Sequence, residues 1–77
     1  MPTILVEDGY RFFLWSNEGT ERAHVHVEKA EAAGKWWLDD LSMEYQDGYN
    51  RAQLRRIREL LKDHQQELQD AWDEHFA

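Results

Sequence analysis

The chain has 77 residues, no Cys, and a net charge of −7 from 16 acidic and 9 basic side chains. This length allows a single small domain, and the absence of Cys excludes disulfides and thiolate metal ligands. The acidic balance argues against a protein that coats nucleic acid, while an apolar content of 42% with four Trp is typical of a folded globule.

The first fifty residues have the pattern of short strands. Asp8-Gly9 lies between two apolar runs, which predicts a tight hairpin turn. His24 to Glu28 alternate strictly between polar and apolar, which predicts a half-buried strand. Residues 31–34 fit either a short helical turn or a hairpin connection. The strand candidates, in chain order, are residues 3–6, 10–16, 24–28, 35–39 and 41–46.

The rest of the chain, about residues 51–76, predicts one helix. Asn50 is a good N-cap, and Gln53 three positions later completes the pattern of a capping box. His64 and His75 fall within the apolar seam and are expected to pack at the sheet edge. The seam residues expected to pack on the sheet are Leu54, Ile57, Leu61, Leu68 and Trp72. We therefore predict an α+β fold with a small curled antiparallel sheet of four to five strands against one long C-terminal helix.

Both faces of the predicted sheet are apolar. Alternation places Phe13 and Trp15 on the face opposite Phe12, and it places Trp37 opposite its two neighbours. One helix cannot cover both faces of such a sheet. Either the curl of the sheet and the segment around Glu31 cover the second face, or its aromatic residues form an exposed patch that binds a partner or a second copy.

The alternation also places His24 and His26 on one side of their strand, together with Glu28. Three interpretations remain open for this set: structural hydrogen bonding on an ordinary face, acid–base or partner contacts, and metal ligation. A metal site would need a third or fourth ligand that the sequence does not place beside the histidines, so we predict neither a metal nor a cofactor.

A loop follows the aromatic strand and carries Asn17 and Glu18. If the flanking strands pair, this loop lies near the start of the histidine strand. Arg11, Glu18 and the two histidines would then form an acid–base and phosphate-contact set. The alternative is a turn held by Asn17 and an ordinary ion pair of Arg11.

The helix is basic in its first half and acidic in its second half, which is the reverse of what its macrodipole favours. Four of the basic residues fall in one line that flanks the apolar seam, about 60° wide at 100° per residue. This line, the basic stripe, consists of Arg51, Arg55, Arg58 and Lys62. It could contact phosphates or an acidic partner, or it could pair with carboxylates of the strand section.

The sequence resembles a small prokaryotic family, the domain of unknown function 4160. The motifs that carry this resemblance are Gly9-Tyr10-Arg11-Phe12-Phe13, Ser16-Asn17-Glu18-Gly19, His24-Val25-His26-Val27-Glu28, Lys35-Trp36-Trp37-Leu38 and the helix end Ala71-Trp72-Asp73-Glu74-His75-Phe76. The resemblance implies a stand-alone protein, often encoded beside another small protein, of a kind suggested to form toxin–antitoxin-type pairs. The family's recurring polar residues correspond here to Arg11, Asn17, Glu18, His24, His26 and Lys35.

The chain departs from the family pattern in two places. Ala23 stands where members commonly have Pro before the first His, which loosens the entry to that strand. Basic residues at Arg51, Arg55 and Arg56 stand where members tend to carry acids, so the basic stripe is a particular property of this protein.

From the polar residues and the resemblance we predict a toxin–antitoxin-type component that acts on RNA or a translation target. The residues expected to be catalytic are His24, His26 and Glu18. The residues expected to bind a substrate or partner are Arg11, Asn17, Lys35, Phe13, Trp15, Trp37, Arg51, Arg55 and Arg58. The alternative is a non-catalytic module that binds a neighbour-encoded small protein or a second copy through the aromatic sheet face. Whether the protein is an enzyme stays open.

The longest apolar run, Phe12–Trp15, is far shorter than the roughly 20 residues that span a bilayer. The start of the chain lacks the basic and apolar regions of a signal peptide. We therefore expect a cytoplasmic protein without membrane contact.

Overall fold

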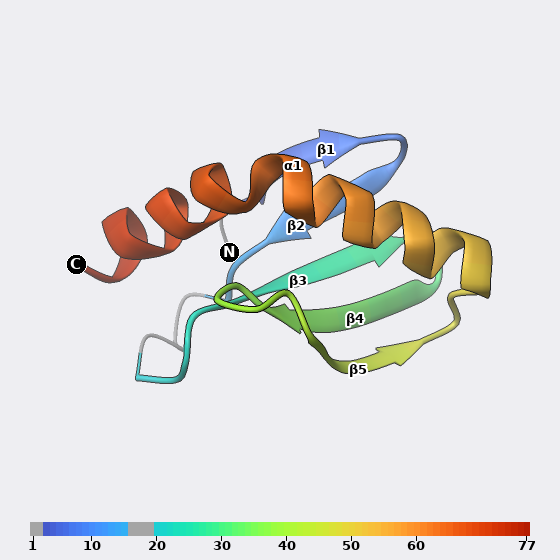
Figure 1. The fold of residues 1–77 in the computed structure, drawn as a ribbon, viewed down its shortest axis with the longest axis horizontal. Coiled ribbons are helices and arrows are strands. Elements are labelled where there is room, and N and C mark those ends of the chain that lie inside the picture. Colours follow the sequence, from blue (N-terminus) through green and yellow to red (C-terminus); the bar gives the residue numbers. More distant parts are fainter. Residues whose placement is uncertain (1–2, 16–19) are drawn as a thin grey trace.

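The computed structural model describes residues 3–15 and 20–77. Five strands form one antiparallel sheet in which each strand pairs with the next along the chain. One long helix then runs across a single face of this sheet (Figure 1). The elements are β1 (Thr3–Glu7), β2 (Tyr10–Phe13), β3 (His24–Lys29), β4 (Ala32–Trp37), β5 (Met43–Asp47) and α1 (Arg51–Phe76). The predicted α+β fold, a sheet against one C-terminal helix, is confirmed.

The turn between β1 and β2 has the predicted form. Asp8 and Gly9 both have positive φ, 54° and 82°, which is the backbone of the two-residue turn that an Asp-Gly pair favours. The strand that follows is shorter than predicted. Its pairing with β3 stops at Phe13, so β2 ends there, and the predicted end at Ser16 lies outside the described residues.

The segment at residues 31–34 is a hairpin connection and not a helical turn. Ala30 takes a positive φ of 53° at the turn, and β4 already begins at Ala32 instead of the predicted Lys35. Ala32 pairs with Lys29 of β3, and the ladder continues along the whole strand. Pairing with β3 satisfies the peptide groups of a segment whose Ala and Gly residues have little strand preference of their own.

The helix begins with the predicted capping box. The side-chain oxygen of Asn50 accepts a hydrogen bond from the Gln53 N–H at 2.8 Å, and the Gln53 side chain accepts one from the Asn50 N–H at 2.9 Å. The first turn therefore has partners for donors that the helix itself cannot satisfy. At the other end α1 extends past the sheet (Figure 1), and His75 is exposed instead of packed as predicted.

The hydrophobic core lies between α1 and the sheet. The sheet side chains in it are Tyr10, Phe12, Leu14, Val25, Val27, Trp36 and Leu38. The predicted seam residues Ile57, Leu61, Leu68 and Trp72 are buried, and Leu54 packs against them partly buried. Leu60, which the seam omitted, is also fully buried, because a helix on a sheet buries a stripe about 100° wide.

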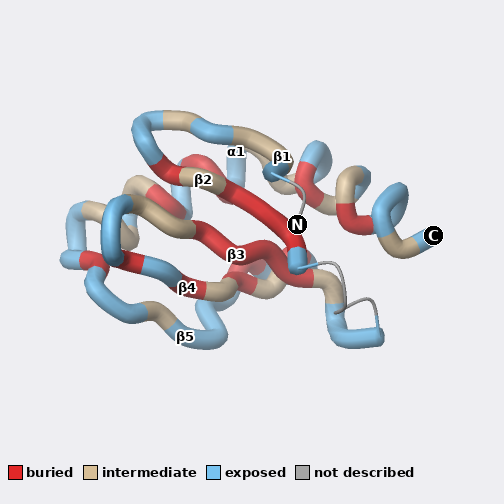
Figure 2. Tube along the Cα trace, turned by 180° about the vertical axis from the view of Figure 1, so that it is seen from behind, coloured by how far each residue is buried: buried red, intermediate tan, exposed pale blue. Residues whose placement is uncertain are grey.

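Tyr49, between β5 and α1, closes one end of the core. Its hydroxyl donates to the Val27 carbonyl at 2.8 Å, and burial raises the pKa of Tyr49 to about 12. Figure 2 shows the resulting pattern: β2 and β3 are largely buried in the middle of the sheet, whereas β5 is mostly exposed at its edge. Within the described ranges, no helix combines the length and the apolar character needed to cross a membrane.

Candidate functional site

The strand pleat sorts the side chains of β3 between two different environments. Val25 and Val27 are fully buried on the side of α1, so His24 and His26 extend from the opposite face of the strand. In the described ranges, the only contact of another layer with this helix-free face that the structure gives is that of Trp72 of α1 with His24, at its end. The strand register brings Phe13 of β2 next to His26 on one side.

Five rings on this face form a continuous chain of contacts, which we name the ring cluster: Phe13, Trp15, His24, His26 and Trp37. His26 stacks on Phe13 with ring centroids 5.4 Å apart, and Trp15 meets both of these rings edge-on at 5.8–5.9 Å. His24 lies 5.2 Å from His26 and 5.8 Å from Trp37. The predicted aromatic face and the predicted histidine pair are therefore one structure.

The ring cluster is buried at its centre and exposed at its margin. Phe13 is 4% exposed, His26 6% and His24 0%, whereas Trp15 is 43% exposed. Tyr45 of the edge strand β5, across from Lys35 in the register, is 51% exposed. The histidines do not lie on a solvated face, because neighbouring rings cover them, whereas the structural hydrogen bonding considered as part of the same interpretation is present at His24.

His24 is held in a defined orientation. Its Nδ1 lies 2.8 Å from the carbonyl oxygen of Arg22, and a carbonyl can only accept, so Nδ1 carries the proton. In the neutral ring Nε2 is then the basic nitrogen. The ring also packs on Trp72 of α1 at 4.9 Å, which ties the ring cluster to the helix layer. The His24 ring is fully buried, so neither of its nitrogens meets solvent in this conformation.

Each cation on the helix-free face already has a carboxylate partner. Arg11 lies over the Phe13 ring at 4.4 Å and pairs with Glu28 at 2.5 Å. Lys35 lies 4.8 Å from the centroid of Trp37 and pairs with Glu21 at 3.0 Å. Glu28 therefore serves Arg11, and not the histidines with which the sequence grouped it. The predicted phosphate contacts of Arg11 and Lys35 would require both ion pairs to open.

Arg22, which the sequence prediction did not single out, is the third cation of this face. Its guanidinium lies 4.7 Å from the centroid of Trp37 and makes two hydrogen bonds to Asp39, at 2.5 and 2.9 Å. The hydrogen bond from Arg22 lowers the pKa of Asp39. Because Asp39 is far away along the chain, no local pattern could have indicated this pair.

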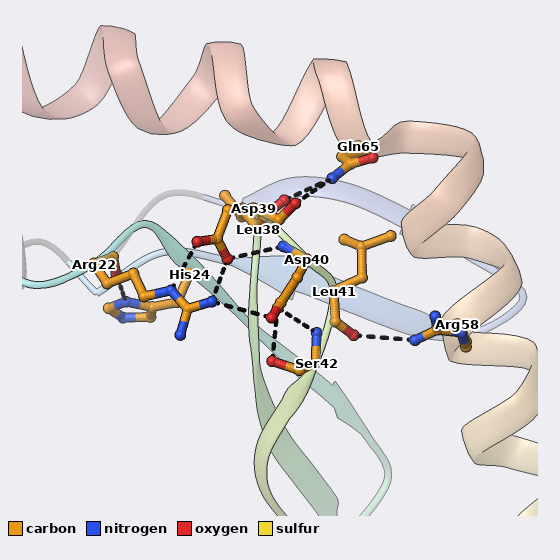
Figure 3. A network of polar contacts seen from close by, with 9 residues as sticks. All are labelled: Arg22, His24, Leu38, Asp39, Asp40, Leu41, Ser42, Arg58 and Gln65. Atoms are coloured by element: carbon orange, nitrogen blue, oxygen red, sulfur yellow. Dashed lines mark hydrogen bonds and ion pairs between the residues drawn. The ribbon is translucent and has the colours of Figure 1, made fainter.

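Two side chains of α1 hold the loop that carries Asp39 (Figure 3). The Gln65 side chain of α1 donates to the Leu38 carbonyl at 2.7 Å, and Arg58 donates to the Leu41 carbonyl at 3.3 Å. Leu41 is buried at a positive φ of 61°, which a residue with a bulky side chain rarely adopts. The helix thus holds the loop that in turn holds Arg22 over the ring cluster.

The predicted site residues fall into three groups. Seven lie together on the helix-free face: Arg11, Phe13, Trp15, His24, His26, Lys35 and Trp37. Arg51, Arg55 and Arg58 lie apart from them, on the helix that covers the other face. Asn17 and Glu18 lie outside the described residues. Alternation in β5 could have added Tyr45 to the first group, because it places Tyr45 on the same face as Lys35.

The described residues offer no candidate metal centre. Among residues 3–15 and 20–77, no three His, Asp or Glu side chains come close enough together to hold a metal ion.

The comparisons with known proteins give one match. Residues 9–73, most of the chain, match the model of the family described as Domain of unknown function (DUF4160). No curated protein and no solved structure matches the chain.

Proposed function

This chain belongs to the family described as domain of unknown function (DUF4160), and because that description names no activity, we propose a function from the site itself. We propose that the protein is a non-catalytic interaction module that binds a second protein through its helix-free sheet face. The resemblance to the family suggests a small neighbour-encoded protein, as in toxin–antitoxin-type pairs, as that partner.

Two exposed aromatic side chains of the helix-free face carry this proposal. Trp15 and Tyr45 leave about half of their surface in water on a face that no described element covers. Arg11 and Arg22 lie at the edge of the same face, stacked on rings. Trp, Tyr and Arg are the residues that most often dominate binding energy at protein interfaces. A net charge of −7 disfavours contact between two copies, so we expect a different protein as the partner.

RNA is less well supported as the target of this face. Single-stranded nucleic acid is usually bound by cations and stacking rings that lie together. Here the cations next to the rings are neutralised by carboxylates, and the basic stripe lies on the helix.

The test measures binding of the neighbour-encoded protein by titration calorimetry, with wild type and with Trp15→Ser/Tyr45→Ser. We expect the double variant to bind at least about 30-fold more weakly, since truncating a hot-spot residue costs about 2 kcal/mol. Gln66→Ser/Asp70→Ser, on the exposed side of α1, is the matched control and should bind like wild type. Equal affinity of wild type and Trp15→Ser/Tyr45→Ser would refute the proposal, and a dimer of this chain alone in sedimentation would replace the partner by a second copy.

Action on RNA is the second candidate, because one observation favours it. The rings of His24 and His26 lie next to each other with centroids 5.2 Å apart, and the bond from its Nδ1 to the Arg22 carbonyl orients the His24 ring. Two imidazoles can divide acid–base work: one takes the proton of a ribose 2′-hydroxyl that attacks the phosphate, and the other protonates the departing 5′ oxygen.

Growth of a bacterial host on induction tests this second candidate. If it is right, wild type arrests growth and fragments RNA, whereas an equally expressed His24→Ala/His26→Ala variant does neither. Because both rings are buried, circular dichroism must show that the variant is folded. His26→Gln, which keeps a polar side chain, provides a milder replacement. Normal growth with wild type would remove the candidate.

A further inference from the structure

The basic stripe is a set of charges without counter-charges. Its four side chains are exposed, and none of them forms an ion pair with a described residue. Arg56, on the same helix, behaves differently: it pairs with Asp8 at 2.6 Å and with Glu59 at 3.2 Å. Pairing with the strand section, one of the two interpretations of the stripe, is thus performed by Arg56 instead of the stripe. In a chain with 16 acidic residues, four adjacent cations without a carboxylate partner among residues 3–15 and 20–77 need another explanation.

The stripe is a nearly straight line of charges along α1. Its members follow each other at intervals of four, three and four residues on one side of α1, and they extend over about 17 Å at 1.5 Å per residue. Arg58 is held in place by its hydrogen bond to the Leu41 carbonyl (Figure 3). The N-terminal end of the helix dipole adds positive potential to the same half of α1.

We propose that the basic stripe binds an acidic segment of a partner protein, with carboxylates spaced at the same intervals along a helix. The array ends abruptly, because α1 carries no Lys or Arg after Lys62 and has five acids from Asp63 onward. A short acidic segment fits on the stripe between Arg51 and Lys62. A polynucleotide that extended beyond Lys62 would meet the acidic half of α1, which repels its phosphates. The described contacts between cations and rings all involve cations outside the stripe, so stacking rings for nucleic acid bases are also missing beside it.

This inference rests on the proposed function, because it names the chemistry of the same partner. The sheet face would supply most of the affinity, and the stripe would supply attraction and orientation. Charges at the rim of an interface act mainly on the association rate and on the choice of partner. The two surfaces are tested separately, since they lie on different sides of the sheet.

A titration followed by nuclear magnetic resonance tests the stripe directly. The probe is a synthetic helical peptide of about fifteen residues, rich in Ala and Gln, with Glu at intervals of four, three and four. At about 20 mM salt, we expect amide shifts confined to residues 51–62 with a millimolar dissociation constant, and their loss at about 300 mM salt.

Two variants with equal net charge separate the stripe from general electrostatics. Arg51→Ala/Arg55→Ala should weaken binding of the peptide about fivefold, whereas Lys29→Ala/Arg56→Ala, which also removes two positive charges, should change it little. Trp15→Ser/Tyr45→Ser should bind the peptide like wild type, so the sheet-face proposal can fail while this one holds. Absence of shifts, equal weakening by both charge variants, or tighter binding of a twelve-nucleotide oligouridine than of the peptide would overturn the inference.

Discussion

Gly34 shows how a single residue fixes the packing of β4. A Cβ atom at this position would lie 2.6 and 2.8 Å from ring atoms of Trp36 and 2.9 Å from the Tyr45 carbonyl oxygen. Real Cβ atoms essentially never come within 3.0 Å of another group. The neighbours here are a buried ring and the backbone of β5, which cannot move aside easily. The core therefore requires glycine here for space.

We predict that Gly34→Ala lowers the free energy of unfolding by about 1–3 kcal/mol, because overpacking forces Trp36 out of its place. Urea unfolding followed by tryptophan fluorescence measures this loss. Ala33→Ser, at the exposed neighbouring position, should change stability by no more than about 0.5 kcal/mol. The same unfolding midpoint for both variants would show that the core can make room for a methyl group.

The histidines show what residue patterns can and cannot predict. Strict alternation places His24 and His26 on one face because strand geometry leaves no other choice. Their burial depends on Phe13, Trp15 and Trp37 and on Trp72 of α1, which meet them only when the strands pair and the helix docks. The sequence therefore predicts the common face but not the covered rings.

At the scale of elements, α1 depends on the hydrogen bonds at its start. No acidic residue lies in its first turn, so the capping box is the main device that stabilises this end. We predict that Asn50→Ala lowers the free energy of unfolding by about 1 kcal/mol, since the Gln53 N–H loses its side-chain acceptor. Thermal or urea unfolding measures the change. Asn50→Asp, with an equally good cap, should retain most of the stability, and an equal loss in both variants would contradict this explanation.

The strands were harder to delimit than the helix. The predicted β4 began at Lys35, since Ala and Gly before it carry no strand signal, yet the ladder with β3 starts at Ala32. Strand ends follow from pairing with a neighbour, which is a tertiary property, whereas the caps and the seam of α1 lie within one continuous segment. The helix boundaries could therefore be predicted closely, and the boundaries of β2 and β4 could not.

At the scale of the whole molecule, His64 joins the helix to the edge strand β1. Its Nδ1 lies 2.8 Å from a carboxylate oxygen of Glu67 and its Nε2 lies 3.0 Å from one of Glu7. Both nitrogens can donate only in the protonated ring. The hydrogen bond to Glu67, followed by that to Glu7, raises the pKa of His64 despite some loss of hydration.

A raised pKa in the folded state stabilises the protein below the pKa of the unfolded chain, and this contribution is lost as the pH rises through the folded pKa. We predict that His64→Gln costs about 0.5–1 kcal/mol of stability near pH 5.5 and much less near pH 8.5. Urea unfolding of both proteins at the two pH values measures the difference. Glu67→Gln should also make the stability less dependent on pH, because it removes the main contact that raises the pKa of His64. The same stability difference between wild type and His64→Gln at both pH values would contradict a raised pKa of His64.

The pairing of positive charges with carboxylates also depends on the whole molecule. The cations of the helix-free face are neutralised by carboxylates, while the basic stripe has no such partners in the described part of the chain. The sequence indicated the stripe through its helical spacing, but it could not show which basic residues find acids. That depends on Asp8 and Glu7, which the β1–β2 turn brings to Arg56 from the other end of the chain.

The sequence by itself determined the local features of this protein: the hairpin at Asp8-Gly9, the capped helix, the alternation of β3 and the membership of the aromatic face. Each depends on turn chemistry or periodicity within a few residues. Only the tertiary structure decided that the histidines are buried, that Arg22 reaches Asp39, and that the basic stripe lies apart from the ring cluster. These properties arise from contacts between residues far apart in the chain, and strand register and helix docking fix such contacts only when the whole sheet forms.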